Sequence, residues 1–414
     1  MTRPGKRGVL MMLILGGAYF FSNFHRLALA VLSETISAEM QLTSMQIGTL
    51  GSAIFYSYAL MQIPCGFFAD RISARKIITV ACILTAGSTV LFAVSSSFPL
   101  MVAARVLTGA ATALIYVPAL SAIRNHFGDS SFGSMTGIMV AMGQMGSVCA
   151  STPLKILSDV LGWQITFIAI GIVTLLLALG AWLLILDTQP APAAPSTATK
   201  TAERRGIRIP MIGWAIVIWF FITAGTRLSF QSLWGNLFFT EGRLYSSSSS
   251  SVFLMCMSIG CILGSILLGK LCDVIGNIRT LIIGTVVLAL GWEALACIPL
   301  GGTVWTVCSM LSCVVIGAAG AGTFTAGFSS IRLYSSKEKT GILTGINNSA
   351  AFIGSAVFTQ FAGEYANMLP VEGIQAQYTG LMTTFFVICL AAALLVWSVD
   401  RHNTKGECSA KTGV

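Results

Sequence analysis

The sequence predicts an all-α membrane protein in which twelve transmembrane helices form two parallel, pseudo-symmetric six-helix bundles. Three observations support this fold class. Only 9% of the 414 residues are charged and 55% are hydrophobic, whereas about 25% of the residues of a soluble domain are charged. Apolar runs longer than about 18 residues, the length of a membrane-spanning helix, recur along the whole chain. Several motifs of the first half return in the second half.

The expected spans fall into two groups of six. In chain order they cover residues 9–36, 44–69, 77–96, 98–125, 131–157 and 162–186, and then 210–239, 247–271, 279–300, 303–333, 340–366 and 377–399. The segment between the groups is rich in proline, alanine and threonine and then becomes basic, which is typical of a connection that need not fold. We therefore expect a first bundle at 1–186, a cytoplasmic linker at 187–209, and a second bundle with a short cytoplasmic tail at 210–414.

Basic residues are unevenly distributed over the connections between the expected spans. If the N-terminus is cytoplasmic, most of the 24 lysines and arginines fall in inner loops or in the tail. This bias is the positive-inside rule, so the net charge of +9 reflects topology and predicts no nucleic-acid partner. We expect a multi-pass protein of the lipid bilayer, in a bacterial inner (plasma) membrane, with both termini in the cytoplasm.

The N-terminal stretch and the cysteines bear on two further questions, removal of a signal peptide and metal binding. The first thirty residues resemble a secretory signal peptide, but His25 and Arg26 interrupt its apolar core, so we expect this stretch to remain as the first span. The eleven cysteines show no metal-ligand spacing and are expected to pack as small residues inside helices. We find no nucleotide-binding loop and no nucleophile–base constellation, so the sequence predicts no enzyme, no catalytic residue, no metal and no cofactor.

The two halves share motifs at nearly constant spacing. The stretch GFFADRISARK (66–76) returns as GKLCDVIGNIR (269–279), and GAATALIYVPALSAIR (109–124) returns as GAAGAGTFTAGFSSIR (317–332). Near the start of each half, Arg26 aligns with Arg227. The spacing changes only in small steps, which indicates short insertions within a true internal repeat. Parallel repeats of this kind place a solute site between the halves near the middle of the membrane.

The loop after the second expected span resembles the signature of the major facilitator superfamily, Gly-x-Leu-Ala-Asp-Arg-x-Gly-Arg-Arg/Lys. In GFFADRISARK, Phe68 replaces the leucine, and Ser73 and Ala74 depart from the usual glycine and arginine. RVLTGAA (105–111) is similar to the Arg-x-x-x-Gly element on the fourth helix of the same superfamily. Together with the span count and the repeat, the resemblance covers essentially the whole chain. It implies a secondary transporter that works by alternating access.

The resemblance also implies a role for the loop motif and its weaker second copy. A carboxylate at the cytoplasmic end of a helix can pair with arginines or with the N-terminus of a neighbouring helix. Such pairs hold an inner gate closed and must break when the halves move. The alternative is a static topology anchor formed by the basic residues. The predicted gating residues are Gly66, Asp70, Arg71, Arg75, Gly269, Asp273 and Arg279.

Three arginines, Arg26, Arg105 and Arg227, are expected to lie embedded in the membrane and not at the cytoplasmic end of a span. At a rise of about 1.5 Å per residue, all three fall within about 10 Å of the bilayer midplane. An arginine at the centre of a helix costs about 2.5–3.5 kcal/mol on insertion scales, and intramembrane charges usually face a watery cavity. Glu293 is the only acidic residue expected deep in the membrane, since Glu34 and Glu364 fall near the outer surface, and we assign Glu293 no role. The natural counter-charge is therefore an anionic solute.

Arg26 and Arg227 belong to the first helix of each half, so the repeat predicts one guanidinium on each wall of a central cleft. A guanidinium donates a planar fork of hydrogen bonds that suits phosphate or carboxylate. This pairing resembles that of the organophosphate:phosphate antiporters of the superfamily. Arg105 is similar in position to a coupling arginine of the organic-anion:cation symporters. The alternative for Arg105 is that it only hydrogen-bonds neighbouring helices.

His25 is expected to point about 100° away from Arg26 around the helix, so the two side chains cannot both point directly into the same cleft. We expect a packed, neutral histidine, and the alternative is a proton carrier that takes part in coupling. Other polar residues share helix faces with the arginines or lie on spans that line the cavity in the superfamily. Each is suited to hydrogen-bond the solute or to hold helices together. These predicted solute-binding residues are Tyr19, Asn23, Tyr58, Gln62, Gln144, Gln231, Trp234, Asn347 and Asn348.

The leading prediction is a secondary active transporter of a small organic anion, either a phosphate ester or a carboxylate, with a zwitterion also allowed. The first alternative is a proton-coupled exporter of drugs or metabolites, although such exporters usually carry an embedded acidic residue in the first half. The second alternative is a transporter-like sensor that binds a solute and signals to a membrane partner. We expect a monomer whose transport is coupled to a proton or cation.

Overall fold

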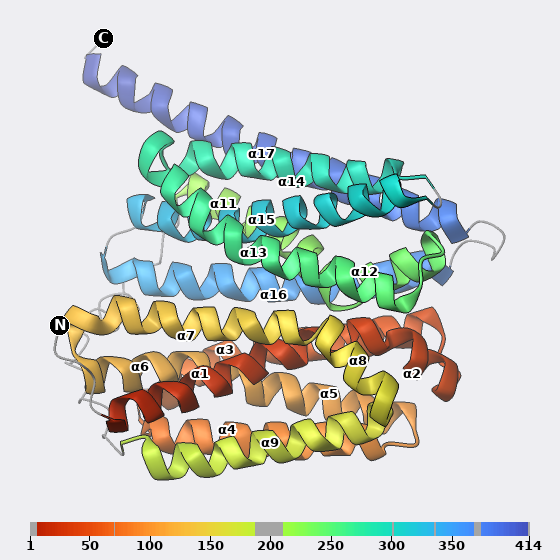
Figure 1. Cartoon of the computed structure of the whole chain (residues 1–414). Coiled ribbons are helices and arrows are strands. Elements are labelled where there is room, and N and C mark those ends of the chain that lie inside the picture. Colours follow the sequence, from red (N-terminus) through yellow and green to blue (C-terminus); the bar gives the residue numbers. More distant parts are fainter. Residues whose placement is uncertain are drawn as a thin grey trace. The chain divides into compact units, whose positions relative to one another are not determined.

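The computed structural model describes residues 6–69, 71–186, 210–299, 302–334, 337–367 and 374–412. Within these ranges all regular secondary structure is helical, which confirms the all-α class. The chain divides into two compact units, Met1–Pro195 and Ser196–Val414, whose helices are labelled in Figure 1. Nine of the described helices are long and apolar enough to cross a membrane, as expected of a multi-pass membrane protein.

The first unit follows the six spans expected for the first half of the sequence, with some of them broken into two helices. Its elements are α1 (Lys6–Leu27), η1 (Ala30–Leu32), α2 (Ser33–Met40), α3 (Ser44–Ala69), α4 (Ala74–Val94), α5 (Phe98–Ala113), α6 (Tyr116–Phe127), α7 (Asp129–Cys149), α8 (Thr152–Leu161) and α9 (Trp163–Leu184).

The second unit contains longer helices and two π-helical turns. Its elements are α11 (Met211–Ser229), the π-helical η2 (Phe230–Trp234), α12 (Gly235–Leu237), the π-helical η3 (Phe238–Gly242), α13 (Ser247–Ile275), α14 (Asn277–Cys297), α15 (Thr303–Tyr334), α16 (Lys337–Asn367) and α17 (Ile374–Thr412).

Two prolines explain why the fourth and fifth expected spans are each two helices. The break between α5 and α6 precedes Pro118, which has no N–H with which to bond the carbonyl oxygen of Leu114. The break between α7 and α8 precedes Pro153, which likewise cannot bond the carbonyl oxygen of Cys149. Each of these two expected spans therefore contains a break between two α-helices, and Phe98–Phe127 still forms one apolar stretch long enough to cross a membrane.

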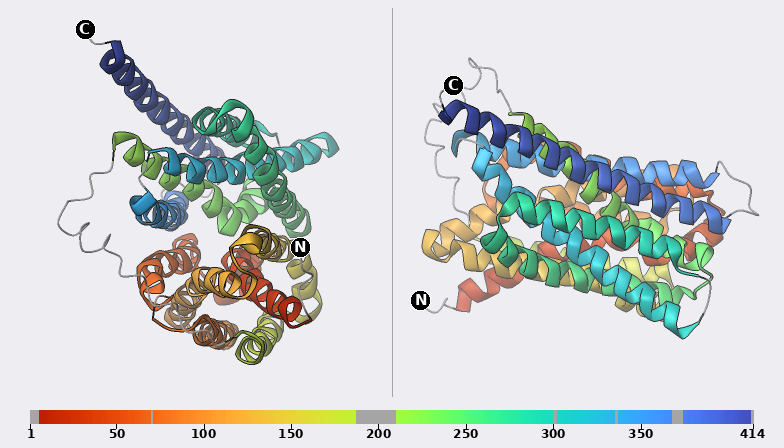
Figure 2. Two further views of the ribbon diagram at one scale, coloured as in Figure 1. Left: turned by 90° about the vertical axis from the view of Figure 1, so that its left-hand side faces the viewer. Right: turned by 90° about the horizontal axis from the view of Figure 1, so that it is seen from above.

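Three other expected boundaries also differ from the structure. The span expected at 9–36 is shorter, because α1 ends at Leu27. The span expected at 210–239 is α-helical only as far as Ser229 and then becomes partly π-helical. The last helix, α17, continues well beyond the expected end at 399 and extends past its neighbours (Figure 2). The end of an apolar run is not always the end of a helix, since α17 continues into the polar stretch after residue 399.

The same three helix pairs pack side by side in both units. In the first unit, α1 packs against α7, α3 against α5, and α4 against α9. In the second unit, α11 packs against α16, α13 against α15, and α14 against α17. The pairs correspond one to one under the internal repeat, so each half builds its bundle in the same way.

Glycines at repeat-related positions bring two of these pairs into close contact. A Cβ atom on Gly146 of α7 would lie 2.1 Å from the backbone oxygen of Phe20 on α1. A Cβ atom on Gly354 of α16 would lie 2.0 Å from the backbone oxygen of Phe221 on α11. Small residues allow helix backbones to approach closely in a membrane. The first helix of each unit therefore packs closely against a glycine on the fifth span of the same unit.

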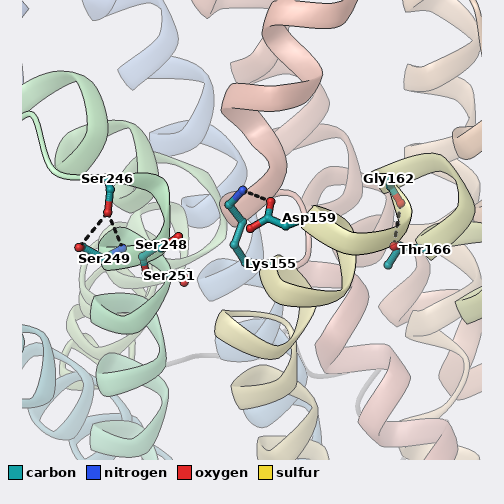
Figure 3. Close-up of polar contacts among 8 residues, drawn as sticks. All are labelled: Lys155, Asp159, Gly162, Thr166, Ser246, Ser248, Ser249 and Ser251. Carbon is teal, nitrogen blue, oxygen red and sulfur yellow. Dashed lines mark hydrogen bonds and ion pairs between the residues drawn. The ribbon is translucent and has the colours of Figure 1, made fainter.

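Local polar contacts stabilise helix ends away from the apolar core (Figure 3). The hydroxyl of Ser246 accepts a hydrogen bond from the backbone N–H of Ser249 at 3.2 Å and so caps α13, as expected for serine at this position. On α8, Lys155 forms an ion pair with Asp159 one turn later. These contacts stabilise the ends of helices and do not indicate a solute site.

Candidate functional site

Arg26 lies in the last turn of α1, and its side chain is only 7% exposed. Its Nε donates a hydrogen bond to the backbone oxygen of Ser22 at 3.2 Å, and its Nη2 donates to Oδ1 of Asn23 at 2.7 Å. The guanidinium carbon lies 5.1 Å from the ring centroid of Tyr58 on α3, which is a cation–π distance. The structure therefore brings three predicted solute-binding residues together: Arg26, Asn23 and Tyr58.

Two further tyrosines extend the contacts of Asn23, the hydrogen-bond partner of this arginine. Asn23 donates through Nδ2 to the backbone oxygen of Tyr19 at 3.0 Å, and the Tyr19 ring lies 5.1 Å from the ring of Tyr116. The side chain of Gln62 hydrogen-bonds Tyr58. Tyr116 was not predicted. It is the first residue of α6, at a helix break whose only signal in the sequence is the proline two residues later.

The fifth span meets α1 at the same face. A Cβ atom on Gly143 of α7 would lie 2.4 Å from the Tyr19 ring and 2.8 Å from Nδ2 of Asn23. The missing side chain at Gly143 therefore leaves room for these two residues. The neighbouring Gln144 is half-buried, and its role in solute binding stays a prediction.

Arg105 on α5 is 4% exposed and hydrogen-bonds the backbone of two other helices. Its Nη1 donates to the backbone oxygen of His25 on α1 at 3.0 Å, and its Nε donates to that of Leu50 on α3 at 3.2 Å. Its Nη2 is buried without a hydrogen-bond partner. The His25 carbonyl belongs to the last turn of α1, where helix carbonyl oxygens lack intrahelical partners. These hydrogen bonds join helices to one another, and a role of Arg105 in coupling stays a prediction.

His25 packs against α4, away from the Arg26 guanidinium. Its side chain is 1% exposed, and its Nε2 lies 3.5 Å from the hydroxyl oxygen of Thr89. The Thr89 hydroxyl also donates to the backbone oxygen of Thr85 at 2.6 Å. The ring of Phe24 meets the imidazole edge-on at 5.7 Å. These contacts are those of a packed histidine, and a role in coupling stays a prediction.

Arg227 on α11 is 9% exposed and has few hydrogen-bond partners. Its Nη1 donates to Oε1 of Gln231 at 2.9 Å and to the Sγ atom of Cys261 on α13 at 3.6 Å. Its Nε is buried and has no hydrogen-bond partner. A buried donor without a partner costs about 1–3 kcal/mol, and more when it is charged. An anion that accepts from this guanidinium would therefore satisfy a group that the described residues leave unsatisfied.

Gln231 extends the Arg227 contacts toward α13, because its Nε2 donates to the hydroxyl of Ser258 at 3.0 Å. Trp234, expected on the same face, instead donates through Nε1 to the backbone oxygen of Thr359 on α16 at 2.9 Å and is fully buried. The π-helical η2 explains this difference, because i→i+5 hydrogen bonds place more residues in each turn. The expected shared face therefore does not extend to Trp234.

Two asparagines and one glutamate complete the predicted polar residues of the second unit. Asn347 on α16 is 1% exposed, and its Oδ1 is buried without a hydrogen-bond partner; Asn348 is half-buried. Glu293 on α14 is half-buried, and its Oε1 lies 3.8 Å from the Sγ atom of Cys297 on the same helix. No role follows for Glu293 from this contact.

The comparisons with known proteins agree with the motif, the repeat and the helix pairing. The sequence profile of the Major Facilitator Superfamily matches residues 12–359. The chain belongs to the Major Facilitator Superfamily. The superfamily fold is also seen in a solved structure, that of a bacterial homologue of the human lysosomal transporter Spinster in an inward-facing, occupied conformation. That structure superposes with a TM-score of 0.76 at 17% identity and covers 96% of this chain and 98% of the other, which confirms the predicted fold class.

Relatives within the superfamily match part of the chain. The probable sulfoacetate transporter of Cupriavidus necator is 28% identical over 157 residues, or 38% of this chain and 36% of that protein. The probable L-galactonate transporter of Escherichia coli (strain K12) is 27% identical over 183 residues, or 44% of this chain and 40% of that protein. The chain therefore covers well under half of the length of these relatives.

The superfamily signature loop connects α3 to α4. The guanidinium carbon of Arg71 lies 3.5 Å from the ring centroid of Phe67, and that of Arg75 lies 4.1 Å from the ring of Trp182 on α9. Both arginines thus lie over aromatic rings. Asp70, the acidic residue of the motif, lies outside the described residues. A gating role for this loop stays a prediction.

The second copy of the motif connects α13 to α14. Asp273 and Arg279 are exposed on either side of this connection, where Gly276 adopts a φ of 88°. A Cβ atom on Gly269, or on Gly66 in the first copy, would meet no atom within 4 Å. Neither glycine therefore makes a close contact with another helix among the described residues, and their gating role also stays a prediction.

Proposed function

We propose that the protein is a secondary active transporter of a small organic anion, in which Arg26 and Arg227 bind the anionic group during alternating access. The main observation in support of this proposal is the burial of Arg227 and its incomplete set of hydrogen bonds. Its guanidinium is buried, its Nη1 contacts an amide oxygen and a sulfur atom, and its Nε has no hydrogen-bond partner. Such a group in a membrane helix indicates a place where an anion supplies the missing charge and acceptors.

The polar surroundings of the two arginines support a solute that also carries hydroxyl groups. Beside Arg26 lie the phenol of Tyr58 and the amide of Asn23. Beside Arg227 lie the amide of Gln231 and the hydroxyl of Ser258. These groups both donate and accept hydrogen bonds, so they can bind hydroxyls next to a carboxylate, sulfonate or phosphate.

The named relatives support the same class of solute. One is a probable sulfoacetate transporter and another a probable L-galactonate transporter. Sulfoacetate carries a sulfonate and a carboxylate, and galactonate is a carboxylate with several hydroxyl groups. We therefore infer a carboxylate or sulfonate as the leading solute class for this chain, with a phosphate ester as the alternative, since all three suit a guanidinium.

Binding is tested by thermal unfolding of the purified full-length protein in detergent. The probes are D-gluconate, sulfoacetate, glucose 6-phosphate and the hydrophobic cation tetraphenylphosphonium. We expect at least one of the anions to raise the melting temperature, because a ligand that binds only the folded state stabilises it. We expect Arg227→Ala to remove this effect. The control is Arg401→Ala, which also removes one positive charge, from an exposed position on α17. Stabilisation by the cation alone would contradict the proposal.

Transport is tested separately by counterflow in proteoliposomes, with the stabilising anion inside and a trace of the labelled anion outside. Exchange that depends on Arg227 supports a transporter. Binding without exchange would instead indicate a solute sensor. An imposed pH gradient in the same vesicles shows whether protons drive uptake.

A further inference from the structure

Gly320 on α15 lies directly against the side chain of Arg227. A Cβ atom at this position would lie 2.2 Å from Cδ of Arg227, 3.1 Å from Nε and 3.2 Å from Cγ. Carbon atoms pack best at about 3.5–4.0 Å, so even a methyl group cannot fit while Arg227 keeps its position. The arginine therefore occupies the space that a side chain at Gly320 would need.

Gly320 differs from the glycines that bring helices together. The three atoms nearest to its missing Cβ all belong to the side chain of Arg227. One turn earlier on α15, a Cβ atom on Gly317 would instead lie 2.1 Å from the backbone oxygen of Met257 on α13. Gly317 thus allows two helix backbones to approach, whereas Gly320 makes room for a functional side chain.

The internal repeat shows that this glycine is specific to the second half. In the aligned stretches 109–124 and 317–332, the position of Gly320 corresponds to Thr112. In the first unit, Arg26 contacts Asn23 on its own helix and Tyr58 on α3. Arg227 thus lies against a glycine on α15, whereas the aligned position in the first unit is a threonine. The internal repeat alone therefore does not require a small residue at position 320.

We propose that Gly320 is a positioning residue for Arg227 and thereby sets the affinity of the second unit for the anion. The proposal rests on the proposed function. The backbone of α15 has little freedom to retreat, because Gly317 and Gly322 hold it against the backbone of α13. A methyl group at Gly320 would therefore displace the arginine rather than the helix. The guanidinium would lose its bonds to Gln231 and Cys261 and its place in the site.

The test measures anion affinity in three variants of the full-length protein, with D-gluconate, sulfoacetate and glucose 6-phosphate as probes. We expect Gly320→Ala to weaken binding of the stabilising anion by about tenfold, the effect of losing one hydrogen bond from a charged donor. The matched control is Gly345→Ala, because a Cβ atom there meets no atom within 4 Å, and its affinity should be unchanged. Gly317→Ala should lower the melting temperature without the tenfold loss of anion affinity, since it separates α13 from α15 and has no contact with Arg227 among its nearest atoms.

A double-mutant cycle separates positioning from packing. Without any added anion, Gly320→Ala should lower the melting temperature of the unchanged protein but not that of the Arg227→Ala variant, which lacks the clashing atoms. An equal loss in both backgrounds, or unchanged anion affinity in Gly320→Ala, would overturn the proposal. If no anion stabilises the unchanged protein, the proposed function fails, while the cycle still decides whether Gly320 acts through Arg227.

Discussion

Arg105 offers a direct test of whether a buried arginine holds helices together or takes part in coupling. Its guanidinium joins the end of α1 to α3 and α5 through the backbone oxygens of His25 and Leu50. The perturbation is Arg105→Ala, which removes both donors and leaves the His25 carbonyl at the end of α1 without this partner. Because Arg26 lies next to His25, a loosened helix end would also disturb the proposed anion site.

The magnitude follows from the hydrogen bonds that Arg105 makes. Two bonds from a charged donor contribute about 3–6 kcal/mol at about 1.5–3 kcal/mol each. The buried Nη2 without a partner offsets about 1–3 kcal/mol of this. The midpoints of these ranges, about 4.5 and about 2 kcal/mol, give an expected net loss for Arg105→Ala of about 2.5 kcal/mol, which corresponds to about 5–10 °C in melting temperature for a unit of this size.

The assay is thermal unfolding in detergent without added solute, so that ligand binding does not contribute. Arg105→Lys is the matched variant, because lysine keeps the charge but has no planar fork with which to reach both carbonyl oxygens. We expect the melting temperature of Arg105→Lys to lie between those of Arg105→Ala and the unchanged protein. If Arg105→Ala unfolds at the temperature of the unchanged protein and loses only transport, the helix-bonding explanation is wrong and the coupling role is favoured.

Two further predictions separate packing residues from solute-binding residues. Trp234→Phe removes the indole N–H that donates to Thr359 and should lower the stability of the second unit by about 1 kcal/mol, as measured by thermal unfolding. The anion affinity of this variant should stay within twofold of that of the unchanged protein. A larger change would indicate that Trp234 takes part in solute binding. His25→Gln should keep both anion affinity and the pH dependence of uptake in proteoliposomes, because His25 faces Thr89 on α4. A shifted pH profile would identify His25 as a proton carrier.

Much of the site was predictable from residue type and position alone. Charged residues are rare in this chain, so each arginine inside an apolar run stands out, and the repeat identifies Arg26 and Arg227 as equivalent. Helical spacing also places Asn23 beside Arg26 and Gln231 beside Arg227, and the structure shows hydrogen bonds in both pairs. Contacts at three and four residues along one helix are local, so they require no knowledge of neighbouring helices.

Contacts between helices were less predictable. Tyr116 reaches Tyr19 because the fourth span breaks before a proline. Trp234 leaves the Arg227 face because a π-helical turn changes the rotation of the helix. Each such break rotates all following side chains about the helix axis, and an error of one residue turns a side chain by about 100°. Spacing rules that assume an unbroken helix fail beyond that point.

By itself, the sequence determined the all-α membrane class, the two related halves, the superfamily and the arginines buried in apolar spans. These properties depend on composition and on patterns that repeat along the chain. Only the tertiary structure decided which partner each polar side chain bonds, as with Arg105 and the carbonyl of His25, or Gly320 and Arg227. The physical reason is that such contacts depend on how neighbouring helices are rotated and how closely they approach, and packing across the whole unit sets both.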